Sequence, residues 1–476
     1  MKPLLINGDH VATTDIVGNI NPSDTHDVID QYCVAGVAEA QDAIEAARDA
    51  FPAWSQSGLQ ARHDLLKTVS DEIMTRRNEL GELLAREEGK TLPEAIGETV
   101  RAAQIFDFFA GEALRLAGEI VPSVRPGVSV EISREPVGVV GVIAPWNFPI
   151  AIPAWKIAPA LCYGNTVVFK PAELVPGCAW ALVDIINRAG APAGVINLVT
   201  GPGRIVGQTM LDSSAIDAIS FTGSVATGQR VAEACTTHMR KFQLEMGGKN
   251  PLVVLDDADI EIALDCAING AFFSTGQRCT ASSRLIVTEG IHNRFVEELS
   301  ERVRSLRVGH ALSEDTQIGP VVDEAQLGQD LDYLKVGVAQ GGNLRVGGTL
   351  VERDTNGHFL QPALITDTTN DMRINREEVF GPVASVIRVK DYDEALHVAN
   401  DTEFGLSSGI CTSSLKHATH FKRNAQAGMV MVNLPTAGVD YHVPFGGTKG
   451  SSYGAREQGR YAAEFFTTVK TAYTLP

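Results

Sequence analysis

The sequence predicts an α/β protein whose main sheets are parallel. From about residue 137, short β-branched segments alternate with segments of helical periodicity, a pattern typical of parallel strands joined by helices. Segments such as 139–143 are apolar without interruption, as expected of strands covered on both faces. A second alternation from 250–257 to about residue 410 predicts a second α/β unit.

Composition and charge exclude several classes of protein. The 476 residues include 40 Lys+Arg and 58 Asp+Glu, which gives a formal charge of −18, and the composition is 44% hydrophobic and 21% charged. This balance is that of an ordered globular protein. So acidic a surface disfavours nucleic acid and anionic membranes as partners. No apolar segment approaches the ~20 residues of a membrane helix, and the N-terminus does not resemble a signal peptide, so we expect a cytoplasmic protein.

The seven cysteines are scattered, and none has the spacing of a metal ligand. We expect reduced, mostly buried thiols, of which at most one or two have a special role. His417 and His420 are three residues apart on a predicted helix, but no third ligand is visible. A solvated helix face is therefore expected there, and no metal site is predicted.

In chain order, the first third is predicted to be helical, because apolar residues recur at helical spacing over 37–51, 65–73 and 106–114. Residues 128–133 then alternate apolar and polar side chains, which predicts a strand with one wet face in a hairpin or a subunit-pairing arm. The C-terminal segment TTVKTAYTLP is also strand-like and is expected to pair with it.

The predicted parallel strands end in turn-rich polar segments, and ligands of such sheets bind beyond the carboxyl ends of the strands. These segments are PWNFP (145–149), KPAE (170–173), TGPG (200–203) and FTGS (221–224). The glycine spacing of GPGRIVGQ departs from GxGxxG, so the standard dinucleotide fingerprint is absent. Lys170 and Glu173 have the chemistry to hold a ribose, and a Gly-Ser turn before a helix can accept a phosphate; salt bridges and helix caps are the alternatives.

Cys279 lies in STGQRCTASS, among polar residues and beside Arg278. Positive charge and backbone N–H groups lower a thiol pKa, so we expect a reactive thiolate here rather than a buried structural cysteine. Glu245, in LEMGGKNP, has the chemistry of a general base, and Asn147, in PWNFP, that of an oxyanion donor. A capping glutamate and an Asx-turn asparagine are the alternatives.

Seven motifs, present together and in order, resemble the aldehyde dehydrogenase superfamily over essentially the whole chain. They are PWNFP, FKPAE, FTGS, LEMGGKNP, GQRC, EEVFGP (377–382) and PFGGTKGSS (444–452). The resemblance implies oxidation of an aldehyde with NAD or NADP, with a Rossmann-like cofactor domain (1–117 and 138–247), a catalytic domain (248–445) and an oligomerisation arm (118–137 and 456–476). It also implies a homodimer or homotetramer.

The resemblance assigns roles residue by residue. Cys279 matches the nucleophile, Glu245 the general base and Asn147 the oxyanion donor. Cofactor contacts are expected from Ile143, Trp146, Lys170, Glu173, Gly203, Gly223, Ser224, Met246, Glu378 and Phe380. A carboxylate at Glu173 would repel a 2′-phosphate, which favours NAD over NADP.

Within the superfamily, the segments GQRCTASSRLIVTEG, IPAWKIAPALCYGN and NLPTAGVDYHVPFGG most resemble the α-ketoglutaric semialdehyde (2,5-dioxovalerate) dehydrogenases. Succinate-semialdehyde dehydrogenases often carry arginine where this chain has Trp155, so succinate semialdehyde or another ω-oxo acid is the alternative substrate. The expected substrate contacts are Arg278, as anchor of a carboxylate, and the aromatic residues Phe148, Trp155, Phe273 and Phe445. The competing interpretation for Arg278 is a salt bridge with a nearby acidic residue, and that for Phe273 is ordinary packing in the core.

Two alternatives differ in class. A catalytically silent binding or structural protein of the same fold is disfavoured because Cys279, Glu245 and Asn147 are all present. An acylating dehydrogenase that uses coenzyme A is disfavoured by Glu245, because such relatives commonly lack this base.

Overall fold

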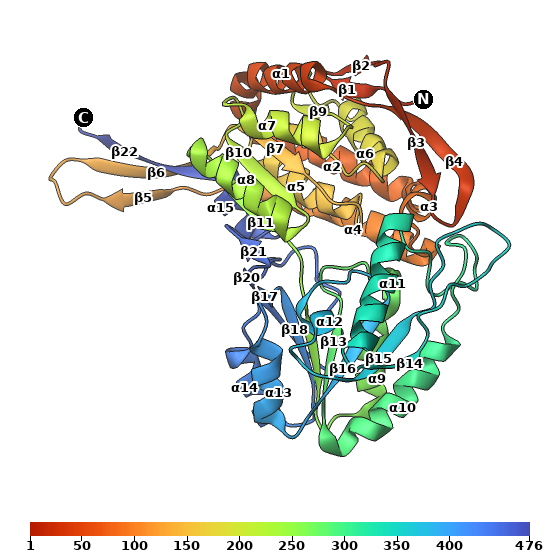
Figure 1. The fold of residues 1–476 in the computed structure, drawn as a ribbon. Helices are drawn as coiled ribbons and strands as arrows, with labels where there is room; N and C mark the ends of the chain where they lie inside the picture. Colours follow the sequence, from red (N-terminus) through yellow and green to blue (C-terminus); the bar gives the residue numbers. More distant parts are fainter.

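Two β-sheets organise the molecule, and each lies in its own lobe, with a thin arm projecting from the side (Figure 1). The computed structural model describes all 476 residues and confirms the predicted α/β fold. No helix combines the length with the apolar composition that a membrane-spanning segment requires.

The first sheet has the strand order β2-β1-β9-β8-β7-β10-β11-β21, in which the short edge strand β21 comprises Ser452–Tyr453. Its parallel centre comprises β7 (Val139–Ile143), β8 (Thr166–Lys170), β9 (Ile196–Leu198), β10 (Ala218–Thr222) and β11 (Lys241–Glu245). The intervening helices are α5 (Ala151–Cys162), α6 (Pro176–Arg188), α7 (Gln208–Asp212) and α8 (Val225–Thr237). Strands β7 and β8 are almost wholly buried, as their uninterrupted apolar sequences predict.

The N-terminal segment departs from the helical prediction. The predicted helices exist as α1 (Val37–Ser55), α2 (Leu59–Thr75), α3 (Arg77–Glu88) and α4 (Leu92–Ala113), but the first 33 residues form strands. These are β1 (Leu4–Ile6), β2 (Asp9–Val11), β3 (Ile16–Asn21) and β4 (Asp24–Cys33). The prediction was wrong here because β1 pairs with the distant β9, a contact that local periodicity does not encode.

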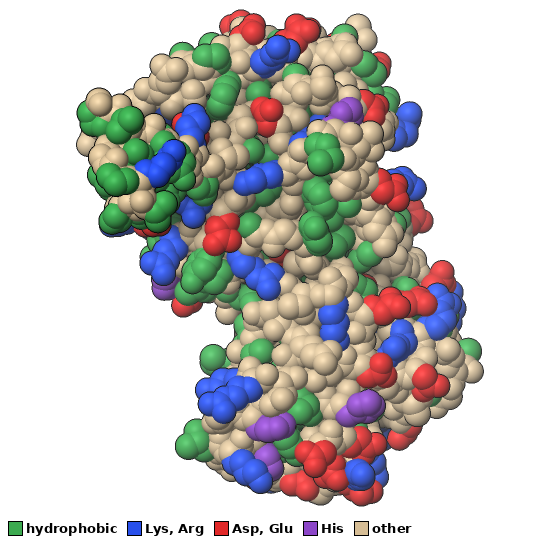
Figure 2. Space-filling view, turned by 90° about the vertical axis from the view of Figure 1, so that its left-hand side faces the viewer, with side chains coloured by type: hydrophobic (Ala, Val, Ile, Leu, Met, Phe, Trp, Pro, Cys, Tyr) green, Lys and Arg blue, Asp and Glu red, His purple; other side chains and the backbone are tan.

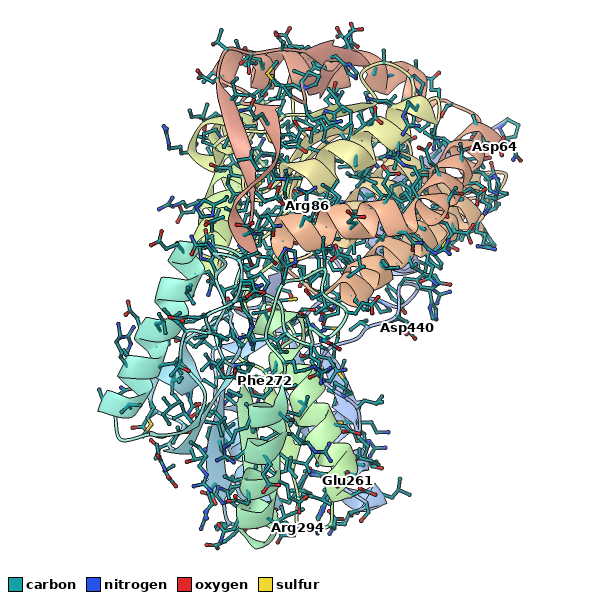
Figure 3. All side chains as sticks on the ribbon, turned by 90° about the vertical axis from the view of Figure 1, so that its right-hand side faces the viewer. Asp64, Arg86, Glu261, Phe272, Arg294 and Asp440 are labelled. Carbon is teal, nitrogen blue, oxygen red and sulfur yellow. The ribbon has the colours of Figure 1, made fainter.

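The second sheet has the order β14-β15-β16-β13-β12-β18-β19 and is parallel apart from its edge strand β14. The strands are β12 (Pro251–Val254), β13 (Arg284–Thr288), β14 (Asn343–Val346), β15 (Ala363–Thr368), β16 (Val383–Val389), β18 (Ser407–Cys411) and β19 (Met429–Val432). The helices include α9 (Ile260–Phe272), α10 (Glu289–Ser305), α11 (Glu324–Ala339), α13 (Tyr392–Asn400) and α14 (Leu415–Asn424). A separate hydrophobic core forms between this sheet and its helices, and it includes the buried Phe272 at the end of α9 (Figure 3).

The arm is a three-stranded antiparallel sheet of β5 (Glu119–Pro122), β6 (Ser129–Pro136) and β22 (Thr467–Thr474). Strand β22 pairs with β6 along its whole length, which confirms the predicted pairing of the C-terminal segment. Figure 2 looks along the arm and shows hydrophobic side chains gathered on it. The exposed ones include Ile120, Val124, Val469, Tyr473 and Leu475.

Candidate active site

Two cavities at the junction of the lobes meet at Cys279. One has a volume of about 370 Å³ and lies against helices α4 and α5. The other has a volume of about 260 Å³ and is formed by the segments that follow β7, β10 and β11, together with residues of the second lobe. Both are lined by Cys279 and Ile152, so the same thiol is reachable from two sides.

Cys279 is the only one of the seven cysteines that is not buried. Its thiol pKa is nevertheless raised to about 12, first by burial below the protein surface and then by the carboxyl groups of Glu245 and Glu378. The backbone N–H groups of Cys279 and Thr280 act in the opposite direction. The expected lowering of the pKa was therefore wrong for the ligand-free protein, because burial and two neighbouring acids outweigh those donors.

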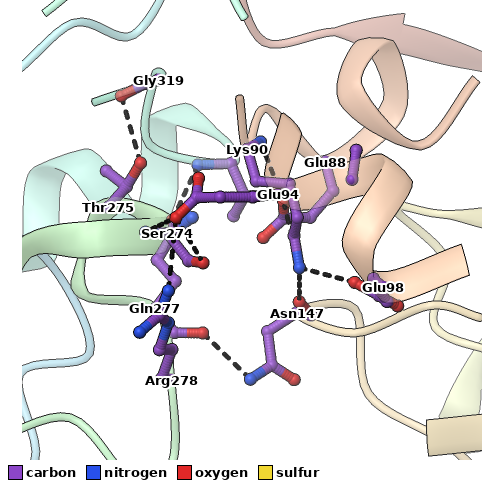
Figure 4. Close-up of polar contacts among 12 residues, drawn as sticks. Glu88, Lys90, Glu94, Glu98, Asn147, Ser274, Thr275, Gln277, Arg278 and Gly319 are labelled. Carbon is purple, nitrogen blue, oxygen red and sulfur yellow. Dashed lines mark hydrogen bonds and ion pairs between the residues drawn. The ribbon is translucent and has the colours of Figure 1, made fainter. Parts of the chain in front are cut away.

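The segment before the cysteine has a strained backbone. Ser274, Thr275 and Gly276 have φ angles of 51°, 56° and 66°, a left-handed conformation that is rare for a β-branched residue. Glu94 holds the turn, because its Oε1 accepts hydrogen bonds from the Ser274 backbone N (2.8 Å) and Oγ (3.1 Å) (Figure 4). Strain of this kind persists only where surrounding contacts impose it.

Asn147 is buried and lies beside Cys279 in the smaller cavity. Its Nδ2 donates to the backbone carbonyl of Gln277 at 3.0 Å, and its own carbonyl accepts from Lys90 Nζ at 2.8 Å (Figure 4). Lys90 also pairs with Glu98 at 2.7 Å. The sequence interpretation missed both Lys90, which holds the PWNFP segment through the Asn147 carbonyl, and Glu98, which accepts from the backbone N–H of Ile150 just after it; both lie about 50 residues upstream.

Glu245 ends strand β11 and is buried, but its carboxylate lines neither cavity. Its Oε2 accepts a hydrogen bond from Ser452 Oγ at 2.6 Å. Burial, and then the charge of Glu457, raise the pKa of Glu245 well above its ordinary value. A carboxyl group with a raised pKa is matched to proton transfer near neutral pH.

A buried ion pair lies next to Glu245. Lys156 Nζ contacts Glu457 Oε1 and also donates to Ser220 Oγ at 2.9 Å. Both charged side chains are fully buried, and the sequence interpretation had identified neither. Lys156 and Glu457 are 301 residues apart in the chain, so no local sequence motif indicates that they form a pair.

The smaller cavity contains most of the predicted cofactor residues. Those that line it are Trp146, Gly223, Ser224, Met246, Glu378 and Phe380. Glu378 Oε1 accepts a hydrogen bond from the Gly248 N–H at 2.8 Å, and the rings of Trp146 and Phe380 pack edge to face with their centroids 5.3 Å apart.

A candidate phosphate site lies in the same cavity. The hydroxyl of Thr222 is buried without a partner, and Ser224 caps the N-terminus of helix α8, which faces this cavity. Free backbone donors and an unpartnered hydroxyl fit the pyrophosphate of a dinucleotide.

The remaining cofactor candidates lie outside the lining of this cavity. Glu173 Oε1 accepts from the Gly203 N–H at 3.0 Å, and Lys170 Nζ donates to the carbonyl of Pro171 at 2.7 Å. Lys170 ends β8, so this group sits at the carboxyl edge of the sheet, as predicted from the turn-rich segments. Ile143, at the end of β7, packs against the core of the first lobe.

The larger cavity contains four of the five predicted substrate residues. Phe148, Trp155, Arg278 and Phe445 line it, and Trp155 and Phe445 stack with their ring centroids 5.2 Å apart. Phe273 does not line it and packs against the core of the second lobe instead. The Arg278 Nη2 lies 3.2 Å from Glu94 Oε1, so this arginine has a local acidic partner.

Arg101 lines the same cavity and was missed from the sequence. It lies on helix α4 with Glu94 and Glu98, at spacings that place all three on one helix face. This helical spacing was the only sequence signal for Arg101. It does not show that this face of the helix lines a cavity.

The family of the protein follows from this geometry and from comparison with known sequences. A model described as the aldehyde dehydrogenase family matches residues 10–472. The chain therefore belongs to the aldehyde dehydrogenase family, which confirms the resemblance and the enzyme class drawn from its motifs.

The similar proteins include semialdehyde dehydrogenases. The chain is 44% identical to an α-ketoglutaric semialdehyde dehydrogenase of Bacillus subtilis, with 99% of this chain and 97% of the relative covered. It is 43% identical to an α-ketoglutarate semialdehyde dehydrogenase of Haloferax volcanii, with 98% of each covered. Among solved structures, betaine aldehyde dehydrogenase of Staphylococcus aureus in complex with NAD+ matches with a TM-score of 0.97 and 34% identity, covering 100% of this chain and 94% of that one.

Proposed function

We propose that the protein oxidises α-ketoglutaric semialdehyde to 2-oxoglutarate with NAD+. The observation that carries this proposal is the meeting of two cavities at Cys279, because the aldehyde and the hydride acceptor must approach the reacting carbon from different sides. The similarity to two semialdehyde dehydrogenases supports the choice of substrate.

In the proposed reaction the Cys279 thiol releases its proton to solvent, and the sulfur attacks the aldehyde carbon to form a tetrahedral thiohemiacetal whose oxygen carries the negative charge. Asn147 Nδ2 and the Cys279 backbone N–H donate hydrogen bonds to the resulting oxyanion. NAD+ held by the residues that line the smaller cavity would supply the hydride acceptor, and transfer of hydride to it from the carbon would leave a thioester on Cys279. Glu245 then takes a proton from a water molecule that hydrolyses the thioester, for which its side chain must rotate away from Ser452.

NAD+ is favoured over NADP+ by Glu173. Its carboxylate lies at the Gly203 N–H near the end of β8, where a 2′-phosphate would meet negative charge. We expect kcat/KM with NAD+ to exceed that with NADP+. Glu173→Gln should reduce the difference, and a parent enzyme that prefers NADP+ would contradict the assignment.

The proposed substrate is tested with a panel of C4 to C6 semialdehydes, assayed by cofactor reduction with and without coenzyme A. We expect the highest kcat/KM with 2,5-dioxovalerate and no requirement for coenzyme A. A higher value with succinate semialdehyde would favour the alternative substrate. A requirement for coenzyme A would favour an acylating enzyme. If no aldehyde were turned over, the result would favour a catalytically silent protein of the same fold.

Asn147→Ala is expected to lower kcat by about 100-fold to 1,000-fold, because one oxyanion donor contributes ~2.7–4 kcal/mol to the transition state. The KM for the aldehyde should change much less, since this donor acts mainly on the developing oxyanion. Steady-state kinetics with the parent as reference measure both parameters. Unchanged turnover would remove Asn147 from the mechanism.

We further propose that the arm joins subunits into a dimer or tetramer, because a three-stranded sheet with exposed apolar side chains on a protein surface is typical of an interface. The double variant Ile120→Asp/Val469→Asp is expected to be monomeric, with a mass near 50.9 kDa in light scattering. Leu415→Asp, at an equally exposed leucine on α14, is the matched control. A monomeric parent would contradict the proposal.

A further inference from the structure

We infer that Arg101 binds the carboxylate of the substrate, an inference that rests on the proposed function because it concerns an acidic aldehyde. Five charged side chains line the larger cavity: Lys90, Glu94, Glu98, Arg101 and Arg278. Lys90 pairs with Glu98 at 2.7 Å and Arg278 with Glu94 at 3.2 Å. Of the three cationic side chains, two are therefore paired with the two carboxylates. Arg101 is the one cation of this cavity that has no carboxylate partner.

The Arg101 guanidinium is held in place but is not satisfied. Its Nη2 donates to Gln458 Oε1 at 3.1 Å, and its central carbon lies 5.7 Å from the centroid of the Trp155 ring. No carboxylate forms a salt bridge with it, and its Nε is buried without a hydrogen-bond acceptor. A buried, unpaired donor of this kind is costly unless a ligand supplies the acceptor.

Trp155 contributes a second unsatisfied donor. Its indole Nε1 is also buried without a partner, while its ring is fixed by the stack on Phe445. Among the side chains that line this cavity, these two alone carry buried polar atoms without partners, and both atoms are donors. The two donors would therefore be satisfied by a ligand group that is negatively charged and has several hydrogen-bond acceptors. A carboxylate with an adjacent ketone is such a group.

Arg278 differs from Arg101 in what it already binds. Besides Glu94, its guanidinium contacts Asn269, and through Glu94 it is tied to the strained turn at Ser274. These contacts fit a residue that stabilises the nucleophile loop. Arg101 thus replaces Arg278 as the principal candidate for the carboxylate anchor.

The test compares two C5 aldehydes that differ by a carboxylate, 5-oxopentanoate and pentanal. For Arg101→Met we expect the ratio of kcat/KM for the acidic over the neutral aldehyde to fall about 100-fold, mainly through KM, because a desolvated charge partner is lost. Arg101→Lys should recover part of this ratio, since the charge remains but the planar fork is absent. Arg115→Met, at an exposed arginine just after α4, is the control and should retain the parent ratio.

The outcomes separate the two proposals. If the parent prefers the acidic aldehyde and Arg101→Met keeps that preference, the inference about Arg101 is wrong and the proposed function stands. If the parent shows no preference, the proposed function fails. If Arg101→Met does not fold, Arg101→Lys provides the test. A kcat/KM ratio of acidic over neutral aldehyde equal to that of the parent would overturn the inference, and a reduced ratio would support it. If Arg278→Met lost the preference for the acidic aldehyde and the Arg101 variants kept it, the role would return to Arg278.

Discussion

Cys279→Ala is expected to abolish aldehyde oxidation, with kcat/KM lowered at least ~10⁴-fold, because no other group can form the covalent adduct. The two cavities would remain, so cofactor binding, measured by fluorescence or calorimetry, should persist. Cys235→Ala, at a buried cysteine of helix α8, is the matched control and should retain activity. An active Cys279→Ala variant would overturn the whole mechanism.

The raised pKa of the Cys279 thiol adds a pH dependence. Because the pKa of about 12 lies far above neutral, the thiolate fraction in the ligand-free protein increases with pH, by about tenfold per pH unit below the pKa. Alkylation of Cys279 by iodoacetamide should accelerate accordingly between pH 7 and 9, as followed by mass spectrometry. A rate independent of pH over this range would show that the thiol is already ionised.

Glu245→Gln is expected to slow steady-state turnover by about 10²-fold to 10⁴-fold, the contribution typical of a general base. Thiohemiacetal formation and oxidation do not need the base in this mechanism, so stopped-flow absorbance should show a burst of about one reduced cofactor per active site. The amide is isosteric and can still accept from Ser452, so folding should be preserved. Parent-like turnover would exclude Glu245 as the base.

The pH profile checks the same role independently. Burial raises the pKa of Glu245, and the base works only when ionised, so kcat should fall as the pH is lowered through this pKa. The Ser452 hydrogen bond acts to lower that pKa, so Ser452→Ala should move the acidic limb to higher pH. A limb that moves the other way, or one that persists in Glu245→Gln, would assign it to another group.

Local sequence predicted the features that depend on nearby residues. The alternation of apolar strands and helices predicted both parallel sheets, because side-chain periodicity reflects which faces are buried. The polar, glycine-containing surroundings of Cys279 distinguished it from six buried cysteines. The alternating segment around 128–133 predicted the arm strand that β22 joins.

The electrostatics of the site depended on contacts that only the tertiary structure creates. Arg278 was expected to act on the thiol and a substrate, but its partner is Glu94, 184 residues away, and the thiol pKa is raised rather than lowered. Arg101 lies in no recognised motif, and the role inferred for it depends on the ion pairs that its neighbours form with one another. Sequence by itself determined the backbone pattern and the reacting groups, since both follow from local chemistry. Folding decided burial and charge pairing, which set pKa values and specificity, because these depend on residues far apart in the chain.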